Sequence, residues 1–114
     1  MTEPAAAPVP VVSREDHKRR YEILVDGQLA GFTEYRDRGE QRVFFHTEID
    51  DAFAGQGLAS RLVQQALTDV RDSGLRAVPI CPYVAKFLKK HTEFDDIADP
   101  VTQDDLRWLR TALR

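Results

Sequence analysis

The sequence predicts an α/β sandwich on a mixed sheet, and two changes in its hydrophobic pattern indicate this. From Arg20 to Ile49, apolar and polar residues largely alternate, as they do in the strands of an antiparallel β-meander. From Leu58 onward, apolar residues recur at helical spacing, and a short apolar run separates this helix from two further helical segments. We therefore predict the order β-β-β-α-β-α-α in a single domain.

Composition narrows the classes of function. The chain has 114 residues, a formal net charge of −3 and one cysteine. The charge argues against a nucleic-acid-binding surface, and no apolar run approaches the ~20 residues that a membrane helix needs. One cysteine excludes an intrachain disulfide framework and a multi-cysteine metal site. We expect a cytoplasmic monomer or weak homodimer with no nucleic-acid partner, no membrane partner and no metal.

The first half of the chain is predicted to form three strands. Residues 1–13 are rich in proline and alanine, so we expect a disordered or extended lead-in that does not pair in the sheet. Asp26-Gly27 is a strong hairpin signal, and the polar segment 36–40 is read as a second turn. The strands then cover residues 20–25, 28–35 and 42–49. Strict alternation in the third strand divides its side chains between two faces: Val43, Phe45, Thr47 and Ile49 on one, and Phe44, His46 and Glu48 on the other.

The second half is predicted to form the α-β-α unit and a terminal helix. A helix begins at Leu58 and ends at Ser73-Gly74, and the strand that follows at 75–80 runs parallel to the third strand. Pro79 lacks an N–H group, so strand pairing should fail there. Helices are expected at 82–90 and 102–113, the second with Thr102 as its N-cap.

A glycine-rich segment lies between the third strand and the long helix. It reads Ala54-Gly55-Gln56-Gly57-Leu58-Ala59-Ser60. Glycines let backbone N–H groups turn inward at a helix start, where the helix dipole also favours an anion. The segment is therefore either a phosphate site or a strand-to-helix turn without a ligand.

Seven further residues could carry chemistry. Cys81 precedes Pro82 at a helix start, a position that stabilises a thiolate, although a lone cysteine is also a common buried apolar residue. His46 shares a strand face with Glu48 and is either a packed histidine or a general base, with Glu48 as the alternative base. Tyr83 either packs on the sheet or serves the reaction. Lys86, Lys89 and Lys90 form either a solvated helix face or a site for a phosphate.

The segment 54–60 resembles the pyrophosphate loop of the GCN5-related N-acetyltransferases, Arg/Gln-x-x-Gly-x-Gly/Ala. Gly57 and Ala59 match its last two fixed positions, whereas Ala54 stands where Arg or Gln is usual. Other segments resemble the minimal, YjdJ-type acetyltransferase-like branch of that superfamily. These are His46-Thr47-Glu48-Ile49, Val78-Pro79-Ile80-Cys81-Pro82-Tyr83-Val84, His91 and Glu93-Phe94-x-x-Ile97. The resemblance implies a minimal acetyltransferase fold at 14–97 with an extra C-terminal helical extension at 98–114.

The resemblance also implies acetyl-CoA as the co-substrate. Its pantetheine arm would enter between splayed strands beside Ile49 and Asp50. Its pyrophosphate would rest on the loop and helix start, at Gly55, Gln56, Gly57, Leu58, Ala59 and Ser60. Lys86 and Lys89 could meet its 3′-phosphate. Cys81 would lie near the thioester sulfur, Tyr83 would protonate the departing thiolate, and His46 or Glu48 would act as base.

We therefore expect an acetyl-CoA-dependent N-acetyltransferase that acts by direct transfer in a ternary complex. The acceptor would be a small-molecule or peptide amine. Four carboxylates near the expected cleft, at Glu34, Glu48, Asp50 and Asp51, would suit a cationic acceptor. The alternatives are a CoA-binding module without catalysis and a protein-interaction domain that uses Trp108 of the terminal helix as an anchor.

Overall fold

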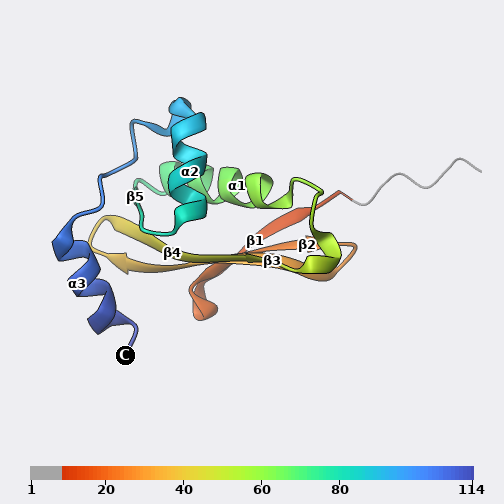
Figure 1. The fold of residues 1–114 in the computed structure, drawn as a ribbon, viewed down its shortest axis with the longest axis horizontal. Helices are drawn as coiled ribbons and strands as arrows, with labels where there is room; N and C mark the ends of the chain where they lie inside the picture. Colours follow the sequence, from red (N-terminus) through yellow and green to blue (C-terminus); the bar gives the residue numbers. More distant parts are fainter. Residues whose placement is uncertain (1–8) are drawn as a thin grey trace, which may run out of the picture.

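A computed structural model describes residues 9–114, and it contains one five-stranded sheet in the order β1-β2-β3-β4-β5 (Figure 1). The first four strands pair antiparallel, and β5 pairs parallel with β4. This confirms the predicted α/β fold with a mixed sheet. The strands are β1 (Val11–Glu15), β2 (Arg20–Val25), β3 (Gln28–Arg38), β4 (Gln41–Ile49) and β5 (Arg76–Pro79), and the helices are α1 (Leu58–Asp72), α2 (Pro82–Lys90) and α3 (Gln103–Ala112).

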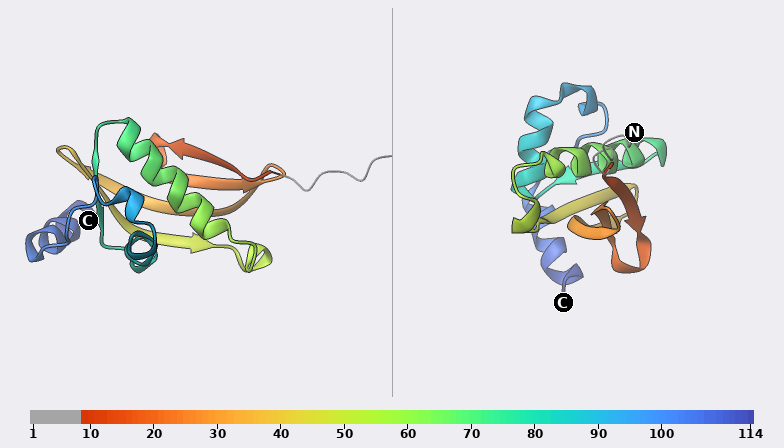
Figure 2. Two further views of the ribbon diagram at one scale, coloured as in Figure 1. Left: turned by 90° about the horizontal axis from the view of Figure 1, so that it is seen from above. Right: turned by 90° about the vertical axis from the view of Figure 1, so that its right-hand side faces the viewer.

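The helices lie on both faces of the sheet. Helices α1 and α2 cover one face, and α3 lies on the other face near one end of the sheet (Figures 1 and 2). The larger core is packed between the sheet and α1 and α2, and a smaller cluster joins α3 to β4 and β5. Helix α3 begins with the predicted capping interaction, in which the Thr102 side chain accepts from the Asp105 N–H and Asp105 accepts in return.

Strand β1 corrects the prediction for the N-terminal segment. Residues 1–8 lie outside the described residues. Val11, Val12 and Ser13 pair with β2, so the prediction of an unpaired lead-in is wrong for these three residues. They follow the last proline of the segment, so each has an N–H group to donate, and valine favours extended backbone. The division of the chain into segments at residues 13 and 97 stays a prediction.

The turn between β3 and β4 is shorter than predicted. Residues 36–38 continue β3, and the turn is reduced to Gly39-Glu40, with Gly39 at a φ of +59°. The polar side chains in this stretch pair with other elements rather than marking a loop. Asp37 accepts hydrogen bonds from Arg42 at 2.8 and 3.0 Å, and Arg38 pairs with Asp104 of α3 at 2.8 Å.

A β-bulge in the β3–β4 pair changes which side chains of β4 share a face. The register shifts because Glu34 pairs with His46 but Tyr35 pairs with Phe44, which leaves Phe45 as an extra residue. Phe44 and Ile49 therefore both belong to the core under α1 and α2. Val43 and Phe45 belong to the cluster at α3. The predicted grouping of Val43 and Phe45 with Ile49 is thus wrong, because it assumed unbroken alternation.

Strand β5 separates from β4 where Pro79 predicted it would. The parallel pairing runs from Gln41↔Arg76 to Phe44↔Pro79 and ends there. One backbone hydrogen bond follows, from the Cys81 N–H to the Phe44 carbonyl at 2.9 Å, and the chain then turns into α2. This separation positions the candidate site.

Candidate active site

The second half of β4 has a free edge. Within residues 9–114, no strand pairs with Phe45–Ile49 on the side that faces β5. The Asp50 N–H donates to the Ala30 carbonyl at 2.8 Å on the β3 side. Because backbone groups alternate between the two edges of a strand, those of Thr47 and Ile49 face the open side. We call this opening between β4 and the β5–α2 connection the gap.

The glycine loop ends at the N-terminus of α1. Gly55 and Gly57 have φ values of +81° and +70°, which side-chain-bearing residues rarely adopt, and Gly57 is the N-cap residue. No described side chain caps the helix, and its first turn holds no acidic residue. The first N–H groups of α1 are therefore available to an anion, and the helix dipole adds to the attraction. The Asp50 carboxylate instead accepts from the Ala52 N–H at 2.9 Å.

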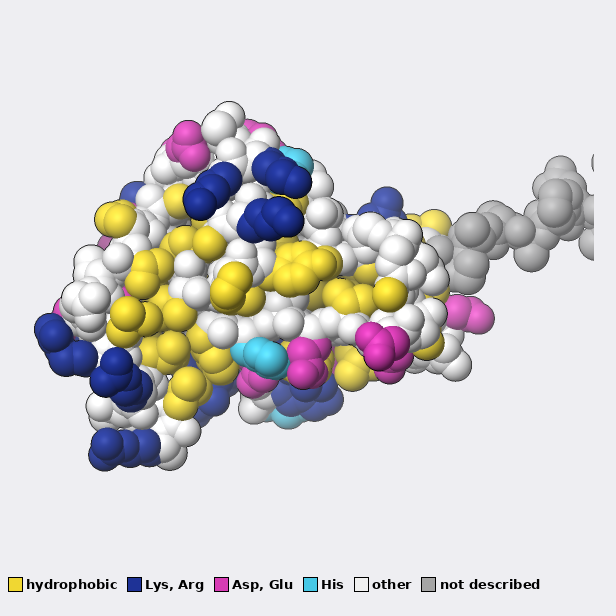
Figure 3. All heavy atoms as spheres, in the orientation of Figure 1, with side chains coloured by type: hydrophobic (Ala, Val, Ile, Leu, Met, Phe, Trp, Pro, Cys, Tyr) yellow, Lys and Arg dark blue, Asp and Glu magenta, His cyan; other side chains and the backbone are white. Residues whose placement is uncertain are grey.

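A cavity of about 470 Å³ lies between the start of α1 and α2. Ser60, Tyr83 and Lys86, three of the predicted site residues, line it, and their roles stay predictions. Lys89 does not line it, and its place is taken by Lys90, which lies one helical turn after Lys86 on the same face of α2. Figure 3 shows basic side chains gathered over this region, with acidic side chains and a histidine below them on the same face of the molecule and an apolar strip between.

Cys81 lies at the beginning of α2, on the side of the sheet that α1 and α2 cover. It is the N-cap residue of α2, and 4% of its surface is exposed. Its Sγ atom lies 3.2 Å from the hydroxyl oxygen of Thr47 in β4. Sequence reasoning named Thr47 only as part of a motif and gave it no role, because the two residues are 34 positions apart.

His46 and Glu48 lie on the other face of β4. Their side chains are 3.3 Å apart (Nε2 to Oε1) and about half exposed, at 47% and 58%. The His46 ring also lies near Phe32, with ring centroids 6.0 Å apart. Cys81 and His46 therefore flank the gap from opposite faces of the sheet, so a group threaded through the gap could meet both.

A shallow groove of about 420 Å³ begins beside Glu48, at the end of the β3–β4 pair. Three carboxylates line it, those of Glu48, Asp50 and Asp51, together with apolar atoms of Phe32. Glu34, the fourth predicted carboxylate, does not line this groove. The remaining lining residues are Leu29, Ala30, Gly31 and Ile49.

Tyr83 lies at the first turn of α2 with 51% of its surface exposed. It contributes to the wall of the 470 Å³ cavity rather than packing into the core. The sequence left open whether Tyr83 packs on the sheet or serves the reaction. The ring does not pack into the core, and its role in the reaction stays a prediction. His91 also lines the cavity, stacked on Phe87 with ring centroids 3.9 Å apart; the sequence named it among the residues that carry the resemblance and gave it no role.

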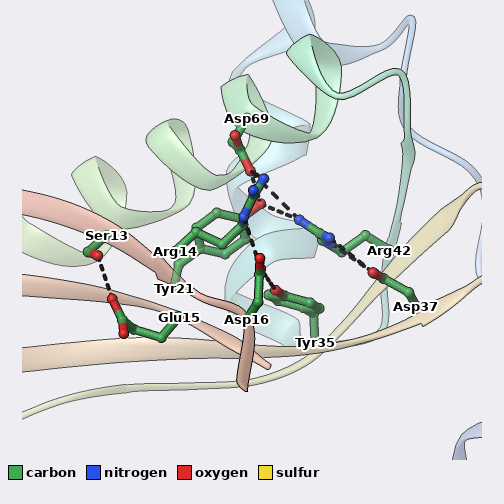
Figure 4. A network of polar contacts seen from close by, with 9 residues as sticks. All are labelled: Ser13, Arg14, Glu15, Asp16, Tyr21, Tyr35, Asp37, Arg42 and Asp69. Carbon is green, nitrogen blue, oxygen red and sulfur yellow. Dashed lines mark hydrogen bonds and ion pairs between the residues drawn. The ribbon is translucent and has the colours of Figure 1, made fainter. Parts of the chain in front are cut away.

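The strongly perturbed ionisable groups lie far from the gap, where β4 begins. There Arg42 donates to the Tyr21 hydroxyl at 2.7 Å and to Asp37, and Tyr21 donates to Asp69 at 2.6 Å (Figure 4). Burial, reinforced by Asp69, raises the pKa of Tyr21, and burial raises the pKa of Tyr35 to about 12. Burial opposes ionisation of Asp69, yet hydrogen bonds from Tyr21 and Arg14 leave its pKa below the ordinary value.

Comparison with known proteins identifies the family. The family model described as GCN5-related N-acetyl-transferase matches residues 20–97, well over half of the chain. The chain belongs to this family. The match covers β2 to the segment after α2, and so includes the gap, the glycine loop and Cys81. Membership of the YjdJ-type branch stays a prediction.

Curated relatives match a shorter part of the chain. Protein NATD1 from Bos taurus is 44% identical over 46 residues, which are 40% of this chain and 41% of that protein. Human Protein NATD1 is 39% identical over 46 residues, with the same shares covered. The chain thus spans about two fifths of the length of the curated relatives it matches.

Solved structures share the fold. A GCN5-like protein from Staphylococcus aureus superposes with a TM-score of 0.62 at 17% identity, covering 82% of this chain and 91% of the other. The acetyltransferase YhbS from Escherichia coli, crystallised with CoA, gives a TM-score of 0.51 at 19% identity, covering 66% of this chain and 62% of its own.

Two further properties bear on the expected partners. Among residues 9–114, no helix is long and apolar enough to cross a membrane. The same described part of the chain holds no group of three or more His, Cys, Asp or Glu side chains arranged to bind a metal ion.

Proposed function

We propose that this chain transfers the acetyl group of acetyl-CoA to an amine, by direct attack of the amine in a ternary complex. The observation that carries the proposal is the gap beside Phe45–Ile49, with the uncapped start of α1 next to it. An extended arm can pair with the free strand edge, as peptides do when they add to a sheet. A diphosphate at the end of that arm can accept hydrogen bonds from the first turn of the helix.

The residues around the gap fit the parts of the coenzyme. Backbone groups of Thr47 and Ile49, which face the open side of β4, would hold the arm, whereas the Asp50 N–H already donates to the Ala30 carbonyl on the β3 side. The pyrophosphate would rest on the N–H groups of the loop and first turn, at Gly55, Gln56, Gly57, Leu58, Ala59 and Ser60. Lys86 and Lys90, which both line the cavity, would supply cations for the 3′-phosphate in place of the predicted pair Lys86 and Lys89.

The reaction needs a base and an acid on either side of the thioester. The amine nitrogen attacks the thioester carbonyl carbon, and its proton passes to His46 or Glu48, which lie 3.3 Å apart on the open face. The C–S bond then breaks, and the CoA thiolate takes a proton from Tyr83. Cys81 lies beside the thioester sulfur in this arrangement. An acetyl-cysteine intermediate is the alternative route.

The acceptor is proposed to be a cationic small-molecule or peptide amine. The groove at the end of the β3–β4 pair carries the carboxylates of Glu48, Asp50 and Asp51, and Glu48 lies beside His46. Negative charge there would attract a cation and would leave the coenzyme to the opposite, lysine-bearing side. The two substrates would therefore approach the gap from opposite faces of the sheet.

A second candidate function is coenzyme binding without transfer. Ala54 favours it, because the alanine offers no side-chain contact where the family pattern has Arg or Gln. The backbone cradle at Gly55–Ser60 would still bind the diphosphate in that case. The two candidate functions therefore predict the same affinity for acetyl-CoA and differ only in whether the acetyl group is transferred to an amine.

Two measurements test these proposals. Millimolar acetyl-CoA should raise the melting temperature, and the absence of any shift would sink both. Release of free CoA thiol, followed with polyamines and lysine peptides, should then exceed the rate in buffer. His46→Ala should lower that rate while coenzyme still raises the melting temperature. Unchanged turnover in His46→Ala and also in Glu48→Gln would remove both from the role of base.

A further inference from the structure

Three side chains form a hydrogen-bonded line from the interior of the sheet to the gap. The hydroxyl oxygens of Thr33 and Thr47 lie 2.9 Å apart, and the Thr47 oxygen lies 3.2 Å from Cys81 Sγ. Thr33 is fully buried and Cys81 is 4% exposed. Thr33 and Thr47 are register partners on β3 and β4. We call Thr33 and Thr47 the hydroxyl pair.

The direction of these hydrogen bonds depends on the state of the sulfur. A thiol can donate to Thr47, and Thr47 can then donate to Thr33. A thiolate can only accept, so Thr47 must donate to sulfur and Thr33 must donate to Thr47. Ionisation of Cys81 therefore turns both hydroxyl protons toward the gap, and hydrogen bonds to the charged form of a group favour that form.

We propose that Thr47 is a positioning residue for Cys81, supported from behind by Thr33. The hydroxyl pair holds Sγ against the free edge of β4 and stabilises its thiolate. The link to acetyl transfer rests on the proposed function above, whereas the effect on the thiol does not. A hydroxyl pair that served only to join two strands would stabilise the sheet and leave the thiol unaffected.

The start of α2 is a second source of thiolate stabilisation, and it can be separated from the first. Cys81 is the N-cap residue, so the helix dipole and the first N–H groups of α2 act on the same sulfur. Substitution at Thr47 leaves that helix unaltered. A change in the pH dependence of alkylation on substitution of Thr47 therefore reports on the hydroxyl and not on the helix.

The test is the pH dependence of alkylation by iodoacetamide, with each rate divided by its plateau at high pH. Cys81 is the only cysteine of the chain, so the signal comes from it alone. Thr47→Val should raise the midpoint by on the order of one pH unit, and Thr33→Val should raise it less. Thr47→Ser, which keeps the hydroxyl, should restore the original midpoint. Thr68→Val is the matched control, because the Thr68 hydroxyl bonds only the Gln64 carbonyl of its own helix.

Two results would overturn the proposal. One is a midpoint in Thr47→Val equal to that of the parent protein. The other is an equal shift in Thr47→Val and Thr47→Ser, which would indicate altered packing rather than a lost donor. If Thr47→Val does not fold, as judged by circular dichroism, Thr33→Val decides by the same criterion. Coenzyme-induced stabilisation, measured on the same samples, tests the proposed function separately, since the alkylation needs no coenzyme.

Discussion

The two halves of β4 are built in opposite ways. In the first half, Arg42 is buried and its guanidinium bonds Asp37 and the Tyr21 hydroxyl, while β5 pairs alongside. In the second half, β5 no longer pairs with β4, and the side chains of His46 and Glu48 lie half exposed on one face. We call the first half of β4, with the side chains of β2, β3 and α1 packed around it, the closed end. The second half, with the adjoining starts of α1 and α2, is the open end. The polar side chains named at the closed end bond one another inside the fold, whereas His46 and Glu48 at the open end contact each other on a half-exposed surface.

The comparison warns against equating perturbed pKa values with function. The raised pKa values of Tyr21 and Tyr35 and the lowered pKa of Asp69 all belong to the closed end. Structural ion-pair networks shift pKa values as strongly as catalytic sites do. Here free backbone groups and a change in strand pairing, rather than perturbed pKa values, distinguish the candidate site.

The largest expected effect follows from removing the centre of the closed end. Arg42→Ala would leave Asp37 and the Tyr21 hydroxyl without their buried partner, because the Arg42 side chain is only 8% exposed. Breaking a fully buried pair costs about 3–5 kcal/mol, and because Asp37 is 46% exposed we expect the lower end of this range, about 3 kcal/mol. We expect the free energy of unfolding in urea to fall by that amount.

Arg107→Ala is the control for that prediction. Arg107 is 67% exposed and pairs with Asp104 at 3.8 Å, so its removal should change the free energy of unfolding by less than about 0.5 kcal/mol. Equal losses in the two variants would contradict the view that the closed end is a stabilising network.

At the open end, Ser60→Glu should separate stability from binding. Ser60 is the third residue of α1 and lines the cavity beside the glycine loop. A carboxylate in the first turn of a helix stabilises it by about 0.3–1 kcal/mol. The same charge would repel the proposed diphosphate, so affinity for acetyl-CoA should fall on the order of tenfold.

Calorimetric titration with acetyl-CoA measures the expected loss of affinity, and unfolding in urea measures the expected gain in stability. Ser60→Gln is the matched control, because it adds similar bulk without charge and should keep most of the affinity. A Ser60→Glu variant that binds acetyl-CoA as tightly as Ser60→Gln would place the anion elsewhere.

Some features of the open end can be read from sequence because their causes are local. Pro79 lacks an N–H group, and Gly57 tolerates a positive φ, whatever surrounds them. The end of strand pairing at Pro79 and the helix start after Gly57 follow directly. The extent of β4, predicted as 42–49 and observed as Gln41–Ile49, follows from its β-branched and aromatic residues, which are also a property of the segment itself.

The features that sequence reasoning missed depend on distant partners. The bulge at Phe45 arises from pairing with β3 and reverses the faces of the residues before it, which alternation within one strand does not reveal. Thr33, Thr47 and Cys81 meet across separations of 14 and 34 residues. Composition contains no signal for either contact. Local features of the open end are therefore predictable from the sequence, whereas contacts between distant residues are not.

The smallest expected effect tests the closed end through its tyrosines. Tyr35 donates to Asp16 at 3.0 Å, and Tyr35→Phe should cost about 1 kcal/mol at neutral pH. Because burial raises the pKa of Tyr35 from its ordinary value of 10.0 to about 12, the fold favours the protonated hydroxyl. This contribution is fully present below pH 10 and is lost as pH rises toward about 12, since the unfolded chain releases the proton first.

Tyr35→Phe should therefore make the alkaline loss of stability less steep, in urea unfolding repeated across this pH range. Some loss should remain, because burial also raises the pKa of Tyr21. Tyr83→Phe is the matched control, since it removes the same hydroxyl from a half-exposed ring at the open end, and it should keep the parent profile. If Tyr83→Phe flattened the profile and Tyr35→Phe did not, the open end would carry the buried proton, and the contrast between the two halves of β4 would be reversed.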